Sequence, residues 1–182
     1  MAKKSAPKRS SAAAGDKDRN ATSSAKTDIR RWAGVRPDLD IRSVVVIGEI
    51  YRLGQAIENE FRTYAQHEFS LGAGDVRILL ALRRSASLPP LRATDLFQSL
   101  LVSSGAVTKQ IDRLERQGYV RRDLDSRQKK QRLISLTKSG KAIADKAIED
   151  IAKTFGISKA VAALPSADVD KFISMIVHMR TV

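Results

Sequence analysis

Residues 103–137, SSGAVTKQIDRLERQGYVRRDLDSRQKKQRLISLT, decide the fold that we expect for this chain. They predict a short helix that ends at Gly118, followed by two strand-like segments, 119–123 and 132–136, with a charged loop between them. Thr137 then opens another helix. A helix, a strand, a basic loop and a second strand in this order outline a winged helix-turn-helix, in which a helix enters the DNA major groove beside a hairpin.

The helix over 103–117 has an apolar face and a polar face. At 100° per residue, Val107, Ile111 and Leu114 fall together and face the core. The expected DNA contacts on this helix are Ser103, Ser104, Gly105, Thr108, Lys109, Arg113 and Arg116. The N-terminal polar side chains suit base edges, whereas the two arginines suit phosphates or internal pairing. A basic helix face is also what any solvated helix shows, so this helix alone does not decide the function.

The loop after this helix strengthens the DNA-binding interpretation. The twelve residues of 121–132 include two acids and six cations, and the cations are Arg121, Arg122, Arg127, Lys129, Lys130 and Arg132. A cationic hairpin beside a basic helix forms a continuous positive strip, which fits phosphate backbones and a minor groove. Within this strip we expect Arg127, Lys129, Lys130 and Arg132 to contact DNA.

Composition agrees with a polyanionic partner and excludes several other classes. The 182 residues carry a formal net charge of +13, and 42% of them are hydrophobic. The chain contains no cysteine, which excludes disulfides and thiolate metal sites. No apolar run has the length of a membrane span, and the N-terminus lacks the apolar segment of a secretory signal. We therefore expect a cytoplasmic protein that does not bind membranes.

The sequence offers no enzyme motif, metal site or cofactor site. Its two histidines, His67 and His178, are far apart and no cysteine accompanies them, so surface or interface positions explain them best. Glycine-rich phosphate loops and nucleophile elbows are absent from the sequence. We expect no enzymatic activity, no metal and no cofactor.

The remaining chain divides into an arm, helices and a dimerisation region. Residues 1–25 form a basic, polar arm that we expect to be disordered, either as a solubilising extension or as an arm that touches DNA. A short extra helix over 26–36 carries Trp32. Dimerisation is expected from the apolar faces of 39–67 and 138–182, and DNA binding from 75–137.

Further helices are expected within these regions. The apolar spacing predicts them over 75–84, 93–100 and 138–155. Ser166 is the expected N-cap of the last helix, because serine often accepts a hydrogen bond from the first helical turn. The fold class is thus mainly α, an α+β winged helix with long terminal helices that form a dimer.

From about residue 41 to residue 180 the chain resembles the MarR family of bacterial winged-helix regulators. The run VTKQIDRLERQGYVRRDLDSRQKKQRLISLTKSGKAI has the family's order of recognition helix, "LE..G.V.R", wing and "LT..G". The resemblance implies a bacterial, nucleoid-associated homodimer on a palindromic operator in double-stranded DNA. The wing departs from the family pattern, since Gln128 replaces a usual acid and Lys130 a usual arginine. Lysine keeps the charge but lacks the planar fork, so Arg127 or Lys129 could take over in the minor groove.

The N-terminal part resembles the urate-responsive branch of this family. That branch has an extra helix with a tryptophan, and the resemblance implies a ligand site of a Trp, an Asp and an Arg. Trp32 and Arg113 match the first and third positions, but ungapped alignment places Arg77 at the second. Asp75, two residues away, is expected to point elsewhere. Trp32, Arg77 and Arg113 are therefore the expected site for a small effector, although Trp32 could be a packing anchor and Arg77 a structural charge.

Two functions fit these residues. The first is a dimeric repressor that binds a palindromic operator and is released by a small anionic or aromatic ligand. The alternative is an architectural or protein-interaction module that coats DNA without sequence preference. The ratio of specific to non-specific affinity separates the two.

Overall fold

The computed structural model describes residues 25–85, 91–92, 96, 104–124 and 132–181, with only the backbone described for 104–106. It is mainly helical and contains one small antiparallel sheet, which confirms the expected fold class. Two compact units, Met1–Ile57 and Glu58–Val182, divide the chain within a long helix. Each unit is described by itself. Over the described ranges, no helix is long and apolar enough to cross a membrane.

The first unit contains a helix over 25–35 and the first half of α2 (Arg42–Phe69). Arg52 of α2 approaches Asp28 of the preceding helix at 3.8 Å. The Asp40 carboxylate accepts the backbone N–H of Arg42 at 3.1 Å, in the manner of a helix cap. Hydrogen bonds from the Arg42 side chain and backbone lower the pKa of Asp40 to about 2. This cap explains why α2 starts slightly later than the sequence predicted.

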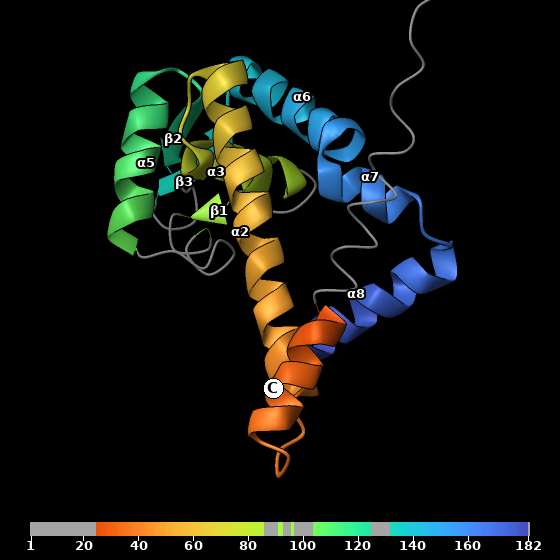
Figure 1. The fold of residues 1–182 in the computed structure, drawn as a ribbon. Coiled ribbons are helices and arrows are strands. Elements are labelled where there is room, and N and C mark those ends of the chain that lie inside the picture. The colour runs from red at the N-terminus through yellow and green to blue at the C-terminus, as the bar shows by residue number, and fades with distance from the viewer. Residues whose placement is uncertain (1–24, 86–90, 93–95, 97–103, 125–131, 182) are drawn as a thin grey trace, which may run out of the picture. The chain divides into compact units, whose positions relative to one another are not determined.

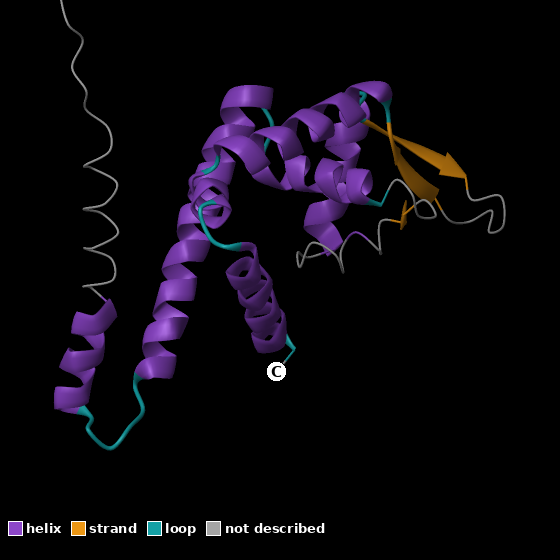
Figure 2. Cartoon of the chain, turned by 90° about the vertical axis from the view of Figure 1, so that its right-hand side faces the viewer, coloured by secondary structure: helices purple, strands orange, loops and turns teal. Residues whose placement is uncertain are grey.

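The second unit is a winged helix-turn-helix (Figure 1). Its elements after α2 are α3 (Ala73–Arg84), β1 (Leu91–Arg92), α5 (Ser104–Arg116), β2 (Val120–Leu124), β3 (Arg132–Leu136), α6 (Lys138–Thr154), α7 (Gly156–Ala162) and α8 (Ser166–Arg180). The three strands lie in the order β1-β3-β2, with Arg122 opposite Ile134. Figure 2 shows β2 and β3 as a hairpin that projects from the helices.

The core of the second unit is aliphatic, as the composition predicted. It joins α3, α5, α6 and the sheet, and its fully or almost fully buried members include Val76, Leu79, Leu96, Val107, Ile111, Leu114, Val120, Ile134, Ala144 and Ala147. Val107, Ile111 and Leu114 have no exposed surface, which confirms the predicted inner face of α5. The opposite face of α5 is consequently left open.

A latch at the base of the wing fixes the start of α6. Gly118 has φ +75°, a left-handed conformation that ends α5 and suits glycine. The Thr137 hydroxyl donates to the Gly118 carbonyl at 2.7 Å and accepts the Gly140 N–H at 3.1 Å. A Cβ at Gly140 would clash with the Tyr119 carbonyl oxygen. Thr137 and Gly140 therefore hold α6 against the turn between α5 and β2.

The end of α2 is tied to α6 by a polar network. The Tyr64 hydroxyl donates to Asp150 at 2.8 Å, and Lys146 bridges Asp150 at 2.5 Å and Glu68 at 3.3 Å. Hydrogen bonds from Lys146 and Tyr64 lower the pKa of Asp150. Burial raises the pKa of the Tyr64 hydroxyl, as does its hydrogen bond to Asp150. The network thus favours a charged carboxylate at Asp150.

Two details of the C-terminal helices differ from the prediction. Pro165, not Ser166, is the N-cap of α8, and Ser166 is its first helical residue. The chain also forms the short helix α7, which was not predicted because its seven residues contain few apolar positions in register. The predicted helix over 93–100 lies outside the described residues except for Leu96, which is buried.

Candidate nucleic-acid interface

The outer face of α5 presents polar side chains on a rigid helix. Thr108 and Lys109 are exposed in its first half, directly beside the buried Val107. Ser104 and Gly105 belong to its first turn by their backbone, whereas Ser103 lies outside the described residues. The buried face anchors α5 to α3, so the exposed positions are held in a defined orientation.

Arg113 is paired internally. Its guanidinium donates to the Asp75 carboxylate at 2.6, 2.7 and 3.0 Å, and Asp75 is only 1% exposed. The expectation that Asp75 points away from this position was wrong. Helix α3 starts at Ala73, two residues earlier than predicted, so Asp75 lies in its first turn and its side chain accepts the Gly72 N–H at 3.2 Å. Asp75 therefore faces α5.

Arg77 has a different partner from the one its alignment implied. It pairs with Glu58 on α2, and its guanidinium lies 4.7 Å from the centre of the Phe61 ring. This geometry is a cation–π contact supported by an ion pair. Trp32 is half-exposed and belongs to the other compact unit. The acid that the resemblance places at position 77 is instead supplied by Asp75, which pairs with Arg113.

The cations of the wing do not all face outward. Arg122 turns inward and donates to Asp112 at 2.5 Å and to Glu115, both on α5. The predicted strip of six outward cations was therefore wrong at this position, because side chains alternate along a strand and Arg122 lies on the inner side. Its neighbour Arg121 is exposed and pairs with Asp123 at 2.9 Å. Arg127, Lys129 and Lys130 lie outside the described residues.

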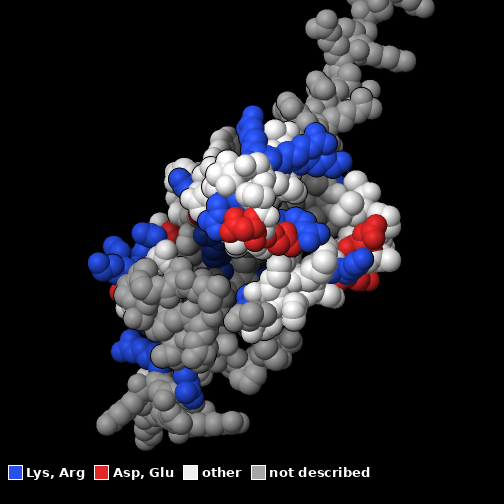
Figure 3. All heavy atoms as spheres, turned by 60° about the horizontal axis from the view of Figure 1, so that its bottom comes forward, with Lys and Arg blue, Asp and Glu red and all other residues white. Residues whose placement is uncertain are grey.

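Three exposed cations remain available around α5 and the wing. Within the described ranges, Lys109, Arg116 and Arg132 form no ion pair with an acidic side chain. The closest polar contact of Arg116 is a weak one, 3.4 Å from its Nε to the Asp112 carbonyl. Figure 3 shows a face on which described cationic side chains predominate, with acidic side chains beside them. A helix and a hairpin that both present cations fit a DNA backbone.

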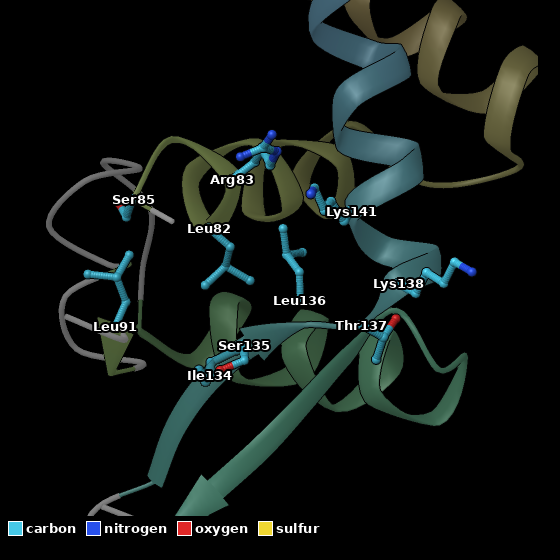
Figure 4. A pocket seen from close by; sticks show the side chains of 10 residues that line it. All are labelled: Leu82, Arg83, Ser85, Leu91, Ile134, Ser135, Leu136, Thr137, Lys138 and Lys141. Atoms are coloured by element: carbon cyan, nitrogen blue, oxygen red, sulfur yellow. The ribbon is translucent and has the colours of Figure 1, made fainter. Parts of the chain in front are cut away.

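A pocket of about 440 Å³ lies at the base of the wing, between α3, the sheet and the start of α6. Leu82 and Leu136 point into the space between α3 and the sheet, whereas Lys138 points away from it (Figure 4). A second pocket, of about 530 Å³, lies between α3 and α6 beside Arg77 and Arg84. Both are large enough for a small organic molecule.

Comparison with known proteins agrees with this architecture. A family model for the MarR family matches residues 76–131. The HTH-type transcriptional regulator PecS of Dickeya dadantii (strain 3937) is 27% identical over 122 residues, which cover 67% of this chain and 73% of PecS.

Solved structures share the fold. The transcriptional regulator BldR of Sulfolobus solfataricus has a TM-score of 0.65 at 20% identity, over 78% of this chain and 96% of BldR. A mutant MarR of E. coli complexed with operator DNA has a TM-score of 0.62 at 20% identity, over 78% of this chain and 98% of that one. The matched segment 76–131 contains all but the first three residues of α3, together with β1, α5 and β2. The chain is thus similar to transcriptional regulators of the MarR family, in its sequence over residues 76–131 and in its fold.

Proposed function

We propose that this protein is a dimeric repressor that binds a palindromic operator and is released by a small anionic or aromatic ligand. The observation that carries the proposal is the exposed half of α5. Thr108 and Lys109 are polar, exposed and fixed by the buried residues beside them. Side chains of this kind at the first half of a recognition helix can read base edges, because lysine donates to guanine and threonine both donates and accepts.

The other proposed DNA contacts lie at the end of α5, in the wing and at the start of α5. Arg116 and Arg132 are exposed at the end of α5 and the start of β3, which suits phosphates. Arg127, Lys129 and Lys130 of the wing loop are proposed for phosphates and the minor groove on their charge alone. Ser103, Ser104 and Gly105 are proposed as DNA contacts at the start of α5, the end of a recognition helix that meets base edges.

A dimer is supported by the apolar surface of α8. No residue of this helix is buried, although Phe172, Ile173, Ile176 and Val177 repeat at helical spacing. The first half of α2 also exposes apolar side chains, including Val46, Ile47 and Ile50. Exposed apolar helix faces of this kind are typically buried against a second copy.

Release by a ligand would act through the joint between α3 and α5. Arg113 connects the recognition helix to the buried Asp75, so an anion that competes for Arg113 would free α5 from α3. Such a ligand shifts the protein only if it binds the two states with different affinity. Trp32, Arg77 and Arg113 remain proposed effector residues, with Asp75 now added as the acid that pairs with Arg113.

The test compares two duplexes at one salt concentration. The DNA upstream of the protein's own gene and a scrambled duplex are measured by fluorescence anisotropy. A repressor of its own gene should prefer the upstream duplex by about a thousandfold. In Lys109→Ala, the preference for one base at a single operator position should fall by about 1–3 kcal/mol. In Arg132→Ala, the affinity for every duplex should fall by the same factor.

Equal affinity for both duplexes leads to a second step, selection of bound sequences from a random duplex pool. Failure to enrich any sequence there would favour the architectural alternative and refute the repressor. An enriched sequence without palindromic symmetry would instead argue against a dimeric reader.

A further inference from the structure

Arg122 occupies an unusual position for a cation in the wing. Its side chain is 19% exposed, whereas that of the adjacent Arg121 is 66% exposed. Its two terminal guanidinium nitrogens bind carboxylates, Nη1 that of Glu115 and Nη2 that of Asp112. Asp112 and Glu115 are three residues apart and share one face of α5, so a single planar guanidinium reaches both.

This arrangement joins the wing to the recognition helix. Arg122 lies in the middle of β2, opposite the buried Ile134 of β3. Only residues 117–119 connect α5 to β2 along the chain. A charge-assisted contact to two carboxylates adds a second connection, so the wing strands and α5 are held at one relative angle.

The same contact changes the charge of the recognition helix. The side chains of Asp112 and Glu115 are 49% and 37% exposed, on a helix that would lie against phosphates. Arg113, the cation between them in sequence, is already paired with Asp75. Arg122 is therefore the cation that neutralises the two acids of α5.

We propose that Arg122 is a positioning residue for sequence-specific DNA binding. Without contacting DNA, it fixes the wing to α5 and neutralises Asp112 and Glu115. This inference rests on the proposed sequence-specific function. It predicts that loss of Arg122 harms the choice between sequences, and does not merely remove one positive charge.

The experiment compares Arg122→Gln with Arg121→Gln in the full-length protein. The two variants lose the same charge at neighbouring positions of one strand, but on opposite sides. Wild type first selects a sequence from a random duplex pool, and affinities for the selected and a scrambled duplex are then measured. Arg122→Gln should lower the ratio of these affinities by about tenfold or more. Arg121→Gln should weaken both duplexes by the same factor and leave the ratio unchanged.

A triple variant separates position from charge. Arg122→Gln with Asp112→Asn and Glu115→Gln removes the uncompensated acids together with the arginine. Affinity for the scrambled duplex should return to within about threefold of wild type, because repulsion from phosphates is relieved. The affinity ratio should stay low, because the clamp between β2 and α5 is still absent.

The outcomes distinguish this inference from the proposed function. If wild type enriches no sequence, the proposed sequence-specific function fails and the positioning role fails with it. If wild type enriches a sequence and Arg122→Gln keeps the full affinity ratio, or if Arg121→Gln lowers it equally, only the positioning role is overturned. Should Arg122→Gln not fold, Arg122→Lys replaces it. Lysine keeps the charge but lacks the fork, so an unchanged ratio would overturn the proposal and a reduced ratio would support it.

Discussion

The winged-helix core and helix α8 are both rich in apolar residues, but only the core buries them. Val76, Leu79 and Ile111 have no exposed surface, whereas Ile173 of α8 is 53% exposed. The core is closed by helices and strands of its own unit, so its stability is a property of one chain. Helix α8 has no buried residue within the described part of the chain, so its apolar face is the surface that we propose a second copy covers. Periodic apolar spacing thus identifies a face to be buried without identifying what buries it.

The largest expected effect is a loss of stability in the winged-helix core. In Gly140→Ala, the new Cβ would clash with the Tyr119 carbonyl oxygen and push α6 away from the base of the wing. Overpacking of backbone against backbone should lower the free energy of unfolding by about 3 kcal/mol. Urea unfolding followed by circular dichroism measures this loss. Ser139→Ala, at the exposed neighbouring position, serves as the control, and equal midpoints for both variants would contradict the latch described for Thr137 and Gly140.

The next effect tests the α8 side. Ile173→Asp places a carboxylate in the face that we expect to be buried in a dimer, once in each copy. Burial of unpaired charge should raise the dimer dissociation constant by about a hundredfold or more. Size-exclusion chromatography with light scattering reports the mass across a concentration series. Lys171→Ala, on the same helix, should leave the mass unchanged, and a wild type that is monomeric at micromolar concentration would remove the reason for the prediction.

The smallest expected effect concerns the polar network that joins the end of α2 to α6 through Asp150. The pKa of Asp150 lies below its ordinary value of 3.8 because Lys146 and Tyr64 donate to it. A carboxyl group whose pKa is lowered in the folded protein stabilises the fold at pH values above its ordinary pKa. This stabilisation is lost as the pH falls through the lowered pKa of the folded protein. Asp150→Asn should therefore have a lower Tm than wild type at pH 6, and the difference should shrink below about pH 4. Thermal unfolding across pH 2.5–7 checks this.

The control for this pH series is Glu149→Gln, whose carboxylate is exposed and pairs with Lys153 along the helix. A difference between wild type and Asp150→Asn that stays constant down to the lowest pH would mean that the Asp150 charge does not support the network.

Local chemistry made much of the fold predictable from the sequence. Thr137 could be assigned as a helix start and Gly118 as a helix end because both roles depend on side-chain type and backbone freedom, which are local properties. Strand β3 was predicted with its observed bounds, since its alternation is bounded by a charged loop and by Thr137. The buried face of α5 followed from spacing alone.

The site residues that were misjudged depend on tertiary direction. Asp75 and Arg77 lie about 200° apart around α3, and the sequence alone did not show that the side of Asp75 faces Arg113 whereas the side of Arg77 faces Glu58. Arg122 looked like one cation among six, and its ion pairs with Asp112 and Glu115 show that it faces α5. The alternation of Arg121 and Arg122 along a strand was the signal that could have separated them.

The latch between Gly118 and Thr137 also bears on how the protein folds. It joins residues 19 positions apart, and the hairpin that it closes contains only the wing. Closing a loop of this length has a small entropic cost, and contacts between residues near in sequence form quickly. All residues of α5, the wing and the latch precede α8 in the chain. The hairpin and its latch use no residue of α8, so they can form before the last helix has packed.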